Sequence, residues 1–374
     1  MSPAKGVAMV VIDADGHVEE NLAGLVEQIP PSMRDVALQF VGESDGHVTY
    51  KVEGRLWRSK YAFPGGLTNH VRAGGERQEG GRDPKVRVQV LDDEGIDAAV
   101  LYPSVGMMFG LIENPDLAAA LCRAYNDWLA DYCRTDPKRL FGVALLPQQD
   151  PRLAARELAR AVNELGFVAG VMRPNKIGGR AVDHPDFDGL WQTAQDLDVP
   201  VGLHEAYISG LDTVGMDRMT SYAGAHIISH VFEQMTGMLV MTLVGVFQRF
   251  PSLRLGFLEA GCGWAPTWVD RIEEHFERAP DDFRGGDPHG VINTRSWLTF
   301  EVEEPALRST LELGWANNVM FASDYPHFDA VYPGAVKEVK ERGLPEELER
   351  NILGQNALRY YGRRLGERLQ LQEG

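Results

Sequence analysis

The sequence predicts an α/β domain with the (β/α)8, or TIM barrel, fold and a long insertion after its first strand. Strand-like apolar runs alternate with helix-like stretches along most of the 374 residues, which is the pattern of a parallel sheet surrounded by helices. The length suits one such barrel, since about 250 residues are typical and insertions add more. With 44% hydrophobic residues, the chain can bury a sizeable core. We therefore expect residues 1–374 to form a single barrel domain.

Eight apolar runs have the length and composition of buried strands. They comprise residues 9–15, 97–102, 140–146, 167–173, 199–204, 253–259, 297–301 and 319–324. Helix signals lie between them: Asp150-Pro151 precedes the periodic stretch Leu153–Leu165, and Pro115-Asp116 opens Leu117–Cys133. The remaining expected helices span residues 185–197, 222–249, 264–278, 305–313, 334–342 and 345–361. Eight strands that alternate with helices favour a parallel barrel.

Residues 18–84 interrupt this alternation with a long, uneven and glycine-rich segment. A structureless loop of that length is improbable inside a compact domain. We therefore expect an insertion with short strands, such as residues 46–57, that lies over the barrel mouth. The end of the segment is locally basic and contains Arg72, Arg77, Arg82 and Lys85. Such an insertion could act as a lid that contacts an anionic substrate, or it could be a solvent-exposed surface segment without a role in binding.

The composition excludes several classes of protein. A formal charge of −17 argues against nucleic acid as a partner, because phosphate binding needs a basic field. No run approaches about eighteen consecutive apolar residues, and the first residues lack the pattern of a signal peptide. Three cysteines without CxxC spacing support neither a disulfide framework nor a zinc ribbon. We expect a cytoplasmic protein that does not enter the membrane.

The first apolar run ends in Val-Val-Ile-Asp13-Ala-Asp15-Gly-His17, which brings together residue types that hold divalent metals. In an extended strand, alternation puts Asp15 and His17 on one side, with Asp13 in phase. Taken alone, Asp-x-His after a strand is also common turn chemistry or a helix cap. A metal site therefore requires partners elsewhere in the chain.

Three later runs also end in ionisable residues. The fifth run ends in His204, the sixth in Glu259 and the eighth in Asp324. In a parallel barrel the carboxyl ends of the strands meet at one face, so these side chains would point into one cavity together with those of the first strand. The four strand ends together predict an active site at the barrel mouth.

Longer motifs carry a resemblance to a known family. They are Asp13-x-Asp15-x-His17, Tyr125-Asn-Asp-Trp128, Gly245-Val-Phe-x-Arg-Phe-Pro251, Leu258-Glu-x-Gly-Cys-Gly-Trp264, Ser323-Asp-Tyr-Pro-His327 and Asn356-Ala-x-Arg-Tyr. They are spread over most of the chain, and in this combination the chain resembles the amidohydrolase-related proteins of the decarboxylase type. That group contains aminocarboxymuconate semialdehyde decarboxylase and the resorcylate decarboxylases. The combination is specific for the family and unspecific for the substrate.

The resemblance implies a divalent metal held by four residues, Asp15, His17, His204 and Asp324. Two positions depart from the family pattern. Many members have His or Glu at the position of Asp15, and several have a catalytic histidine where this chain has Glu259. His230, in Ser-His-Val-Phe-Glu, is therefore our candidate for the catalytic acid/base.

The ligand types and the resemblance leave two reactions open. Carboxylates and imidazoles suit Zn, Mn or Fe(II) better than a soft thiolate metal. In a hydrolase, the ion would lower the pKa of bound water to about 7, and Asp324 would orient or deprotonate that water. In a decarboxylase, the ion would anchor a carboxylate or a neighbouring hydroxyl, while His230 or Glu259 exchanges a proton with the carbon that loses CO2. We expect a lyase or a hydrolase that acts on a small organic acid.

Two further alternatives stay open. His230 and Glu259 could complete a site for a second ion, and two iron ions could activate oxygen. The relatives of this barrel that act as monooxygenases in diterpenoid biosynthesis resemble the chain in this respect. The chain could also be a metal-stabilised binding protein without turnover, since fold alone does not fix function.

Three residues are candidates for substrate binding. Arg173, at the end of the fourth run, carries a planar fork that pairs with carboxylates, although a structural salt bridge would use it equally well. Trp264 could line an apolar part of the pocket, and His327 follows Asp324 closely. Because barrels of this family commonly form dimers, the resemblance also implies a homodimer.

Overall fold

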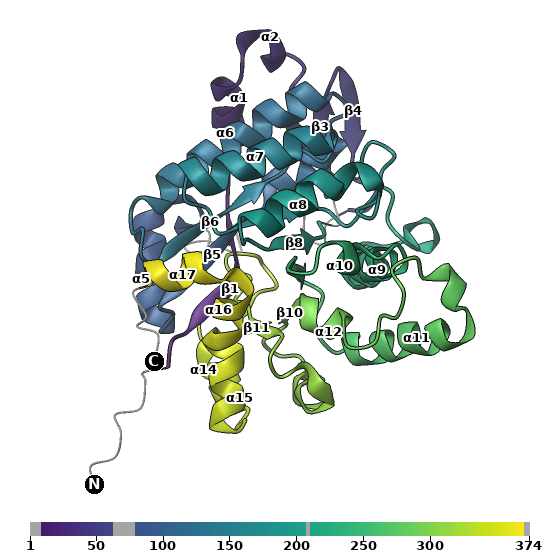
Figure 1. Cartoon of the computed structure of the whole chain (residues 1–374). Helices are drawn as coiled ribbons and strands as arrows, with labels where there is room; N and C mark the ends of the chain where they lie inside the picture. The colour runs from purple at the N-terminus through teal and green to yellow at the C-terminus, as the bar shows by residue number, and fades with distance from the viewer. Residues whose placement is uncertain (1–8, 63–78, 207–209, 370–374) are drawn as a thin grey trace.

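Eight parallel strands lie side by side in chain order at the centre of the molecule, and helices surround them (Figure 1). The computed structural model describes residues 9–62, 79–206 and 210–369 of the chain. The strands of the barrel are β1 (Ile12–Val18), β5 (Ala98–Pro103), β6 (Leu140–Leu145), β7 (Ala169–Met172), β8 (Val201–His204), β9 (Leu255–Leu258), β10 (Ser296–Phe300) and β11 (Val319–Phe321). The prediction of a (β/α)8 barrel is confirmed.

Backbone hydrogen bonds join the first strand of the barrel to the segment after the last one. His17 N donates to Tyr325 O at 2.8 Å, and Asp324 N donates to Asp15 O at 3.2 Å. Both bonds connect β1 with residues that follow β11. These two bonds close the barrel and place the acidic and imidazole side chains of β1 beside Asp324.

An irregularity in β1 changes the direction of its side chains. Asp13 pairs with Ala99 of β5, whereas His17 pairs with Tyr102. Their partners in β5 are separated by an odd number of positions, so Asp13 and His17 face opposite sides of the sheet. One extra residue of β1, a β-bulge, lies between the two pairs. The prediction that Asp13 lies in phase with His17 is therefore wrong, because it assumed an unbroken alternation.

Several outer helices begin with an N-cap residue that is followed by proline. Asn114 accepts a hydrogen bond from Asp116 N before α6, and Asp150 accepts one from Arg152 N before α7, with proline at the start of each helix. The helices after the insertion are α5 (Pro84–Glu94), α6 (Pro115–Cys133), α7 (Pro151–Glu164), α8 (Asp188–Asp196), α9 (Tyr222–Leu243), α10 (Val246–Arg249), α11 (Ala265–Arg278), α12 (Ile292–Arg295), α13 (Leu307–Thr310), α14 (Ala335–Glu341), α15 (Glu346–Arg350), α16 (Asn356–Tyr361) and α17 (Arg363–Arg368). Within the described part of the chain, no helix combines the length and the hydrophobicity needed to cross a bilayer.

Several helical regions differ from the sequence prediction, and two of them have a clear physical reason. Residues 222–249 were expected as one helix, but Gly245, with a left-handed φ of 72°, separates α9 from α10. The helix α5 is absent from the prediction, because its buried side holds only Val90 and Leu91 beside the charged Arg87. Its apolar pattern is too weak to indicate a helix.

The insertion after β1 contains a three-stranded antiparallel sheet. It comprises α1 (Leu22–Gln28), α2 (Pro31–Arg34), β2 (Gln39–Ser44), β3 (His47–Val52), β4 (Arg55–Arg58) and α4 (Glu79–Arg82). Lys60 and Tyr61, just after β4, donate hydrogen bonds to Met216 O, between β8 and α9. The end of β4 therefore lies beside a segment that leaves the carboxyl end of β8. Two of the basic residues expected near the mouth, Arg72 and Arg77, lie outside the described residues.

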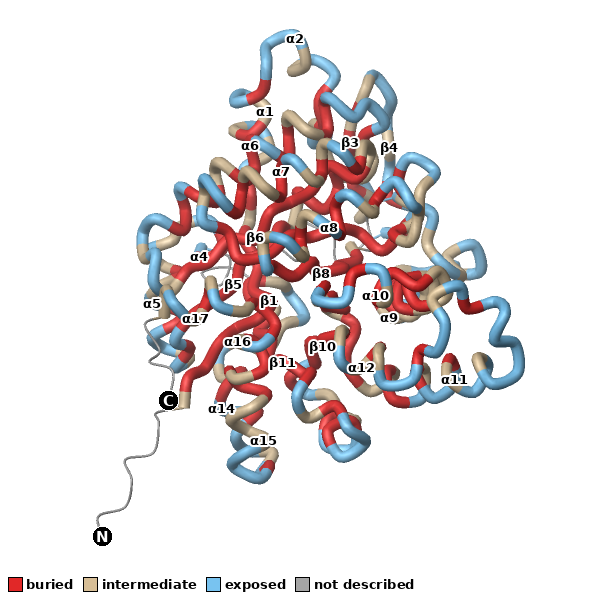
Figure 2. Tube along the Cα trace, viewed as in Figure 1, coloured by how far each residue is buried: buried red, intermediate tan, exposed pale blue. Residues whose placement is uncertain are grey.

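The barrel strands form the buried centre of the fold. Every residue in these eight strands is buried, while the outer turns of the helices are exposed (Figure 2). Tyr361 of α16 reaches this centre: its hydroxyl donates to Ala14 O at 2.6 Å and lies 2.9 Å from the Tyr102 hydroxyl. Ionisable groups inside such an apolar centre need specific partners, which makes the residues at the strand ends informative.

Candidate metal centre

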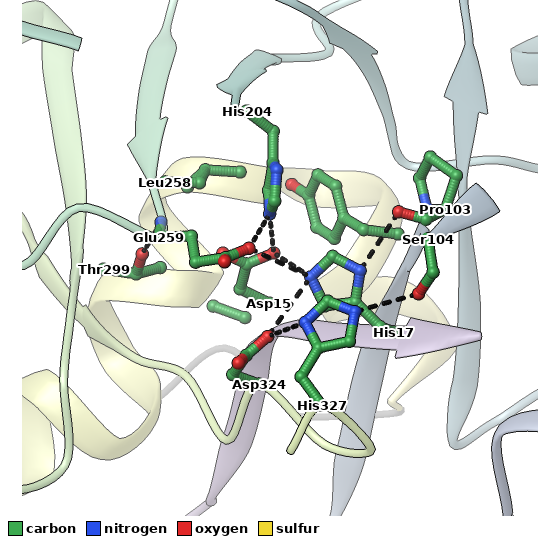
Figure 3. Close-up of polar contacts among 12 residues, drawn as sticks. Asp15, His17, Pro103, Ser104, His204, Leu258, Glu259, Thr299, Asp324 and His327 are labelled. Atoms are coloured by element: carbon green, nitrogen blue, oxygen red, sulfur yellow. Dashed lines mark hydrogen bonds and ion pairs between the residues drawn. The ribbon is translucent and has the colours of Figure 1, made fainter. Parts of the chain in front are cut away.

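Four ionisable residues converge at the carboxyl ends of the barrel strands (Figure 3). Asp15 and His17 belong to β1, His204 ends β8, and Asp324 follows β11. His17 Nε2 lies 3.7 Å from Asp15 Oδ1 and 3.5 Å from Asp324 Oδ1. His204 Nε2 lies 3.8 Å from Asp15 Oδ1. These separations suit donor atoms that share one ion, since each would lie about 2.0–2.2 Å from it.

The donor atoms of these four residues are buried and have no hydrogen-bond partner within the described residues. They are Asp15 Oδ1, His17 Nε2, His204 Nε2 and Asp324 Oδ1. Leaving a buried polar atom unpaired costs about 1–3 kcal/mol, so four such atoms at one point indicate a common partner. A divalent cation would be a partner for the atoms of Asp15, His17 and His204, which lie within 4.8 Å of one another, while Asp324 Oδ1 comes within that distance of His17 in a second group with Glu259 and His327. The residues present therefore fit a bound metal ion.

Backbone carbonyl oxygens accept hydrogen bonds from the Nδ1 atoms of the two histidine ligands. His17 Nδ1 lies 3.1 Å from Pro103 O, and His204 Nδ1 lies 2.7 Å from Glu205 O. Because a carbonyl can only accept, each Nδ1 carries a proton and leaves the Nε2 lone pair for an ion. Burial lowers the pKa of His17 well below its ordinary value, and the neighbouring His327 and His204 lower it further. His17 is thus held in the neutral form that binds metals.

The carboxylates of the centre repel one another. Burial raises the pKa of Asp15 well above its ordinary value, and the charges of Glu259 and Asp324 add to this effect. Burial also raises the pKa of Asp324 well above its ordinary value, although the imidazole of His327 opposes the change. A divalent cation would reverse both effects, because it stabilises the ionised carboxylates. The raised pKa values and the donor atoms without hydrogen bonds therefore both indicate a site for a cation.

Glu259 and Asp324 both adopt left-handed backbone conformations, with φ of 50° and 52°. Such a conformation costs a residue with a side chain about 1–3 kcal/mol and persists only where its surroundings impose it. Glu259 N donates to Thr299 Oγ1 at 2.9 Å, and Asp324 N donates to Asp15 O at 3.2 Å. These bonds hold the two strand ends in place, and both side chains turn toward the centre (Figure 3).

Glu259 connects the centre to His230. Its Oε2 atom lies 2.8 Å from His204 Nε2, without the direction of a hydrogen bond, and its Oε1 atom lies 3.2 Å from His230 Nε2. Burial disfavours the charged form of His230, but the Glu259 carboxylate outweighs burial and raises the pKa of His230 to about 9. Burial likewise opposes ionisation of Glu259, yet His204 and His230 hold its pKa well below the usual range. At neutral pH the pair is an imidazolium and a carboxylate.

His327 lies between Asp324 and Ser104. Its Nδ1 atom is 2.7 Å from Asp324 Oδ1, and its Nε2 atom is 3.0 Å from Ser104 Oγ. Its ring centroid lies 4.1 Å from that of His17. Donor atoms of His17, Glu259, Asp324 and His327 come close enough to share an ion, as do those of Asp15, His17 and His204. His230 lies outside both groups within the described residues.

The other two residues expected to bind substrate have protein partners. Arg173 is 2% exposed, and its Nη2 atom lies 2.6 Å from Glu205 Oε1. Trp264 precedes α11, donates from Nε1 to Gly261 O at 3.0 Å and contacts Phe257 edge to face. These contacts account for the positions of both side chains without a ligand.

Sequence reasoning missed two polar residues of this region. Glu205 directly follows His204 and could have been noticed as a second ionisable residue at the end of β8. Ser104 stands in a loop after β5 with no motif around it, and only its contact with His327 reveals it. Their roles depend on contacts between distant segments, which spacing along the chain does not encode.

The fold and the buried donor atoms define a (β/α)8 barrel with a candidate metal site at the carboxyl ends of its strands. A family model described as amidohydrolase matches residues 12–363, and the chain belongs to this family. The resemblance inferred from the sequence motifs is confirmed.

Relatives with assigned activities support the family placement. The chain is 31% identical to 2-amino-3-carboxymuconate-6-semialdehyde decarboxylase of Dictyostelium discoideum over 288 residues, which cover 75% of this chain and 77% of that protein. Among solved structures, an amidohydrolase from Mycobacterium avium subsp. paratuberculosis has a TM-score of 0.77 at 19% identity and covers 95% of this chain and 100% of its own. A dihydroxybenzoic acid decarboxylase from Polaromonas, with bound manganese and 2-nitroresorcinol, has a TM-score of 0.68 at 21% identity, covering 94% and 96%. The two structures bear on the fold.

Proposed function

We propose that this chain is a metal-dependent decarboxylase that acts on an aromatic or otherwise conjugated carboxylic acid. The observation that carries the proposal is the convergence of four buried donor atoms that form no hydrogen bond, from Asp15, His17, His204 and Asp324, beside the His230–Glu259 pair. The relative from Dictyostelium discoideum and the manganese-containing structure from Polaromonas are both named as decarboxylases, which supports this reaction over hydrolysis.

Asp15, His17, His204 and Asp324 would hold the ion. Two imidazole nitrogens and two carboxylate oxygens suit Mn, Zn or Fe(II), and the manganese bound by the Polaromonas enzyme supports the first of these. The ion supplies positive charge that anchors an acidic group of the substrate and stabilises negative charge that develops on it. All four ligand side chains come from the ends of three strands, which fixes the position of the ion relative to the barrel.

His230 would act as the general acid and Glu259 as the residue that keeps it protonated. When the bond between the ring carbon and the carboxyl carbon breaks, CO2 leaves and the electron pair stays on the ring carbon. That carbon then takes a proton from His230 Nε2, which lies 3.2 Å from Glu259 Oε1. His230 would thus compensate for the absence of the usual histidine at the end of β9, where this chain has Glu259.

The alternatives receive less support. The hydrolase alternative would use Asp324 to orient water, and His327 already lies 2.7 Å from that carboxylate. The oxygenase alternative, with two iron ions, required His230 and Glu259 as ligands of a second ion, and no relative described above is named as an oxygenase. A binding protein without turnover would not need an imidazolium beside the ion.

The test is a decarboxylation assay of the protein loaded with Mn(II). A panel of mono- and dihydroxybenzoic acids, with non-hydroxylated benzoic acids as controls, would be incubated in D2O. We expect CO2 release from at least one acid and one deuterium at the carbon that lost it. Manganese-loaded protein that releases no CO2 but hydrolyses an ester or amide, or consumes oxygen, would overturn the proposal.

Further expectations accompany this proposal. Residues 18–84 would form a lid over the mouth within one domain, and Trp264 and His327 would contact the substrate. The protein would be a cytoplasmic homodimer. Light scattering coupled to size-exclusion chromatography measures the mass directly, and a particle of one chain, 41.5 kDa, would contradict the dimer.

A further inference from the structure

A buried polar network lies next to the proposed ion ligands and takes no part in the reaction described above. Arg173, directly after β7, is its central residue. Arg173 Nη2 lies 2.6 Å from Glu205 Oε1, Nε donates to Asn175 Oδ1 at 3.1 Å, and Nη1 donates to Met107 O at 3.3 Å. Each nitrogen of the guanidinium therefore has a protein acceptor. A substrate carboxylate would have to displace at least one of them.

The network also fixes the backbone of Arg173. Gln148, after β6, accepts a hydrogen bond from Arg173 N at 2.6 Å and donates one to Arg173 O at 2.9 Å. The guanidinium is thus anchored at both ends, by its own peptide groups and by its three acceptors. Anchoring of this kind suits a group that holds another residue in place.

Glu205 carries the network to the ion site. Its side chain is fully buried, and Oε1 accepts from Arg173 Nη2 and from Asn175 Nδ2, the latter at 3.1 Å. The same residue offers its backbone oxygen to His204 Nδ1 at 2.7 Å. The Glu205 side chain therefore determines where its carbonyl lies, and that carbonyl determines which way the His204 ring faces.

We propose that Arg173 and Glu205 are positioning residues that set the affinity of the site for its metal by orienting His204. The proposal rests on the ion site of the proposed function, and it reassigns Arg173 from a substrate ligand to a support of the ion ligand. Loss of a group that orients a metal-binding histidine typically weakens metal affinity by about 10- to 100-fold.

The experiment titrates metal-free protein with Mn(II) and follows free Mn(II) by electron paramagnetic resonance, so that no substrate is needed. Arg173→Met should weaken binding by about 10- to 100-fold, and Glu205→Gln, which keeps an acceptor for Arg173 but loses the charge, should weaken it by less. The double variant should bind no more weakly than the weaker single variant, because both changes break one network. Arg173→Lys keeps the charge but lacks the planar guanidinium with its several donors. Its affinity for Mn(II) should therefore lie between those of Arg173→Met and wild-type protein.

A matched control comes from another part of the barrel. Arg160 and Glu157 on α7 form a pair of the same length, 2.6 Å, with side chains 10% exposed. Arg160→Met should lower stability without changing Mn(II) affinity. Glu205→Gln retains the shape of the side chain and an acceptor for Arg173, so it tests the proposal even if Arg173→Met fails to fold.

The outcomes separate this proposal from the proposed function. If wild-type protein binds Mn(II) and the folded Arg173 and Glu205 variants bind it equally well, the positioning role is wrong and the ion site stands. A variant that keeps its metal affinity but needs more substrate for half-maximal rate would restore Arg173 as a substrate ligand. Wild-type protein that binds no divalent metal would overturn both proposals.

Discussion

The two faces of β1 carry buried charged clusters that differ in how their atoms are partnered. On one face, Asp13 accepts hydrogen bonds from Ser323 N at 2.9 Å and Ser323 Oγ at 2.6 Å, and it lies 3.5 Å from Arg87 Nη2. Arg87 Nη1 in turn donates to His17 O at 2.8 Å and Tyr325 O at 3.2 Å. We call Asp13, Arg87 and Ser323 the seam cluster, because these contacts join β1 to the segment around β11.

On the other face, the donor atoms of the ion cluster, Asp15, His17, His204 and Asp324, form no hydrogen bond within the described residues, and two of them have only the ionic neighbours Glu259 and His327. Both clusters contain an aspartate of the same strand, and all their side chains are buried except that of Asp324, which is 16% exposed. Burial therefore does not distinguish a structural charge from a functional one. The distinction lies in whether the buried atoms already have partners within the described residues, since an unpaired group is retained only where something else binds it.

The sharpest test of this comparison is His204→Ala. The variant should lose its metal and its turnover, because Nε2 of His204 is one of the four proposed donor atoms for the ion. Elemental analysis and the decarboxylation assay measure both effects. The metal-free variant should unfold at a somewhat lower denaturant concentration than metal-free wild-type protein, because the bond from Nδ1 to Glu205 O at 2.7 Å and the contact of Nε2 with Glu259 are lost. The exposed His289, paired with Asp287, provides the control His289→Ala. Full metal loading with unchanged activity in His204→Ala would falsify the assignment.

A second variant separates the acid from the ion ligands. His230→Gln should lower kcat by about 10²- to 10⁴-fold and leave the metal content unchanged, because general acid catalysis contributes on this scale. Inductively coupled plasma analysis and steady-state kinetics on the same preparation decide the point. His275→Gln, on the exposed side of α11, is the matched control. Loss of metal in His230→Gln would show that His230 is a ligand.

The seam cluster should respond in the opposite way. Arg87→Met leaves the Asp13 carboxylate buried without its counter-charge, which should lower the free energy of unfolding by about 3–5 kcal/mol. Urea denaturation of the metal-free protein measures the loss. Adding Asp13→Asn should restore part of the stability, because the unpaired charge is then removed. A variant with wild-type stability would show that the pair contributes nothing to the barrel seam.

The smallest expected effect concerns the residue between the clusters. A Cβ atom at Gly16 would collide with Arg87 Nη2 and Asp13 Oδ2, both in the seam cluster. Gly16→Ala should therefore lower stability by about 1–3 kcal/mol through overpacking, with little change in metal affinity. Gly366 in α17 has no atom near its missing Cβ, and Gly366→Ala should be neutral or stabilising. A Gly16→Ala protein that is stable but cannot bind metal would contradict the division between the two faces.

Much of the fold and part of the site could be predicted from the sequence. Apolar runs that end in His204, Glu259 and Asp324 are local features, and in a parallel barrel their carboxyl ends must meet. The same argument brings Asp15 and His17 to that face. Strand identity, strand order and the polar ends of strands are therefore available from spacing alone.

The remaining features depend on contacts that spacing does not encode. The direction of Asp13 follows from one extra residue in β1, whose position only the pairing with β5 defines. The helix α5 presents the charged Arg87 to the barrel, so its pattern does not look apolar. The partners of Arg173 lie in the segments that follow β5, β7 and β8, and a single sequence does not show that they meet.

The β-bulge in β1 also affects how related chains should be aligned. A relative without the extra residue could keep an acid at the seam and an Asp-x-His pair at the mouth with one residue fewer between them. An alignment across this strand would then require a gap, and a continuous alignment would match residues with different roles. An acid found at position 13 would report how the barrel is closed, and it would carry no information about the ion.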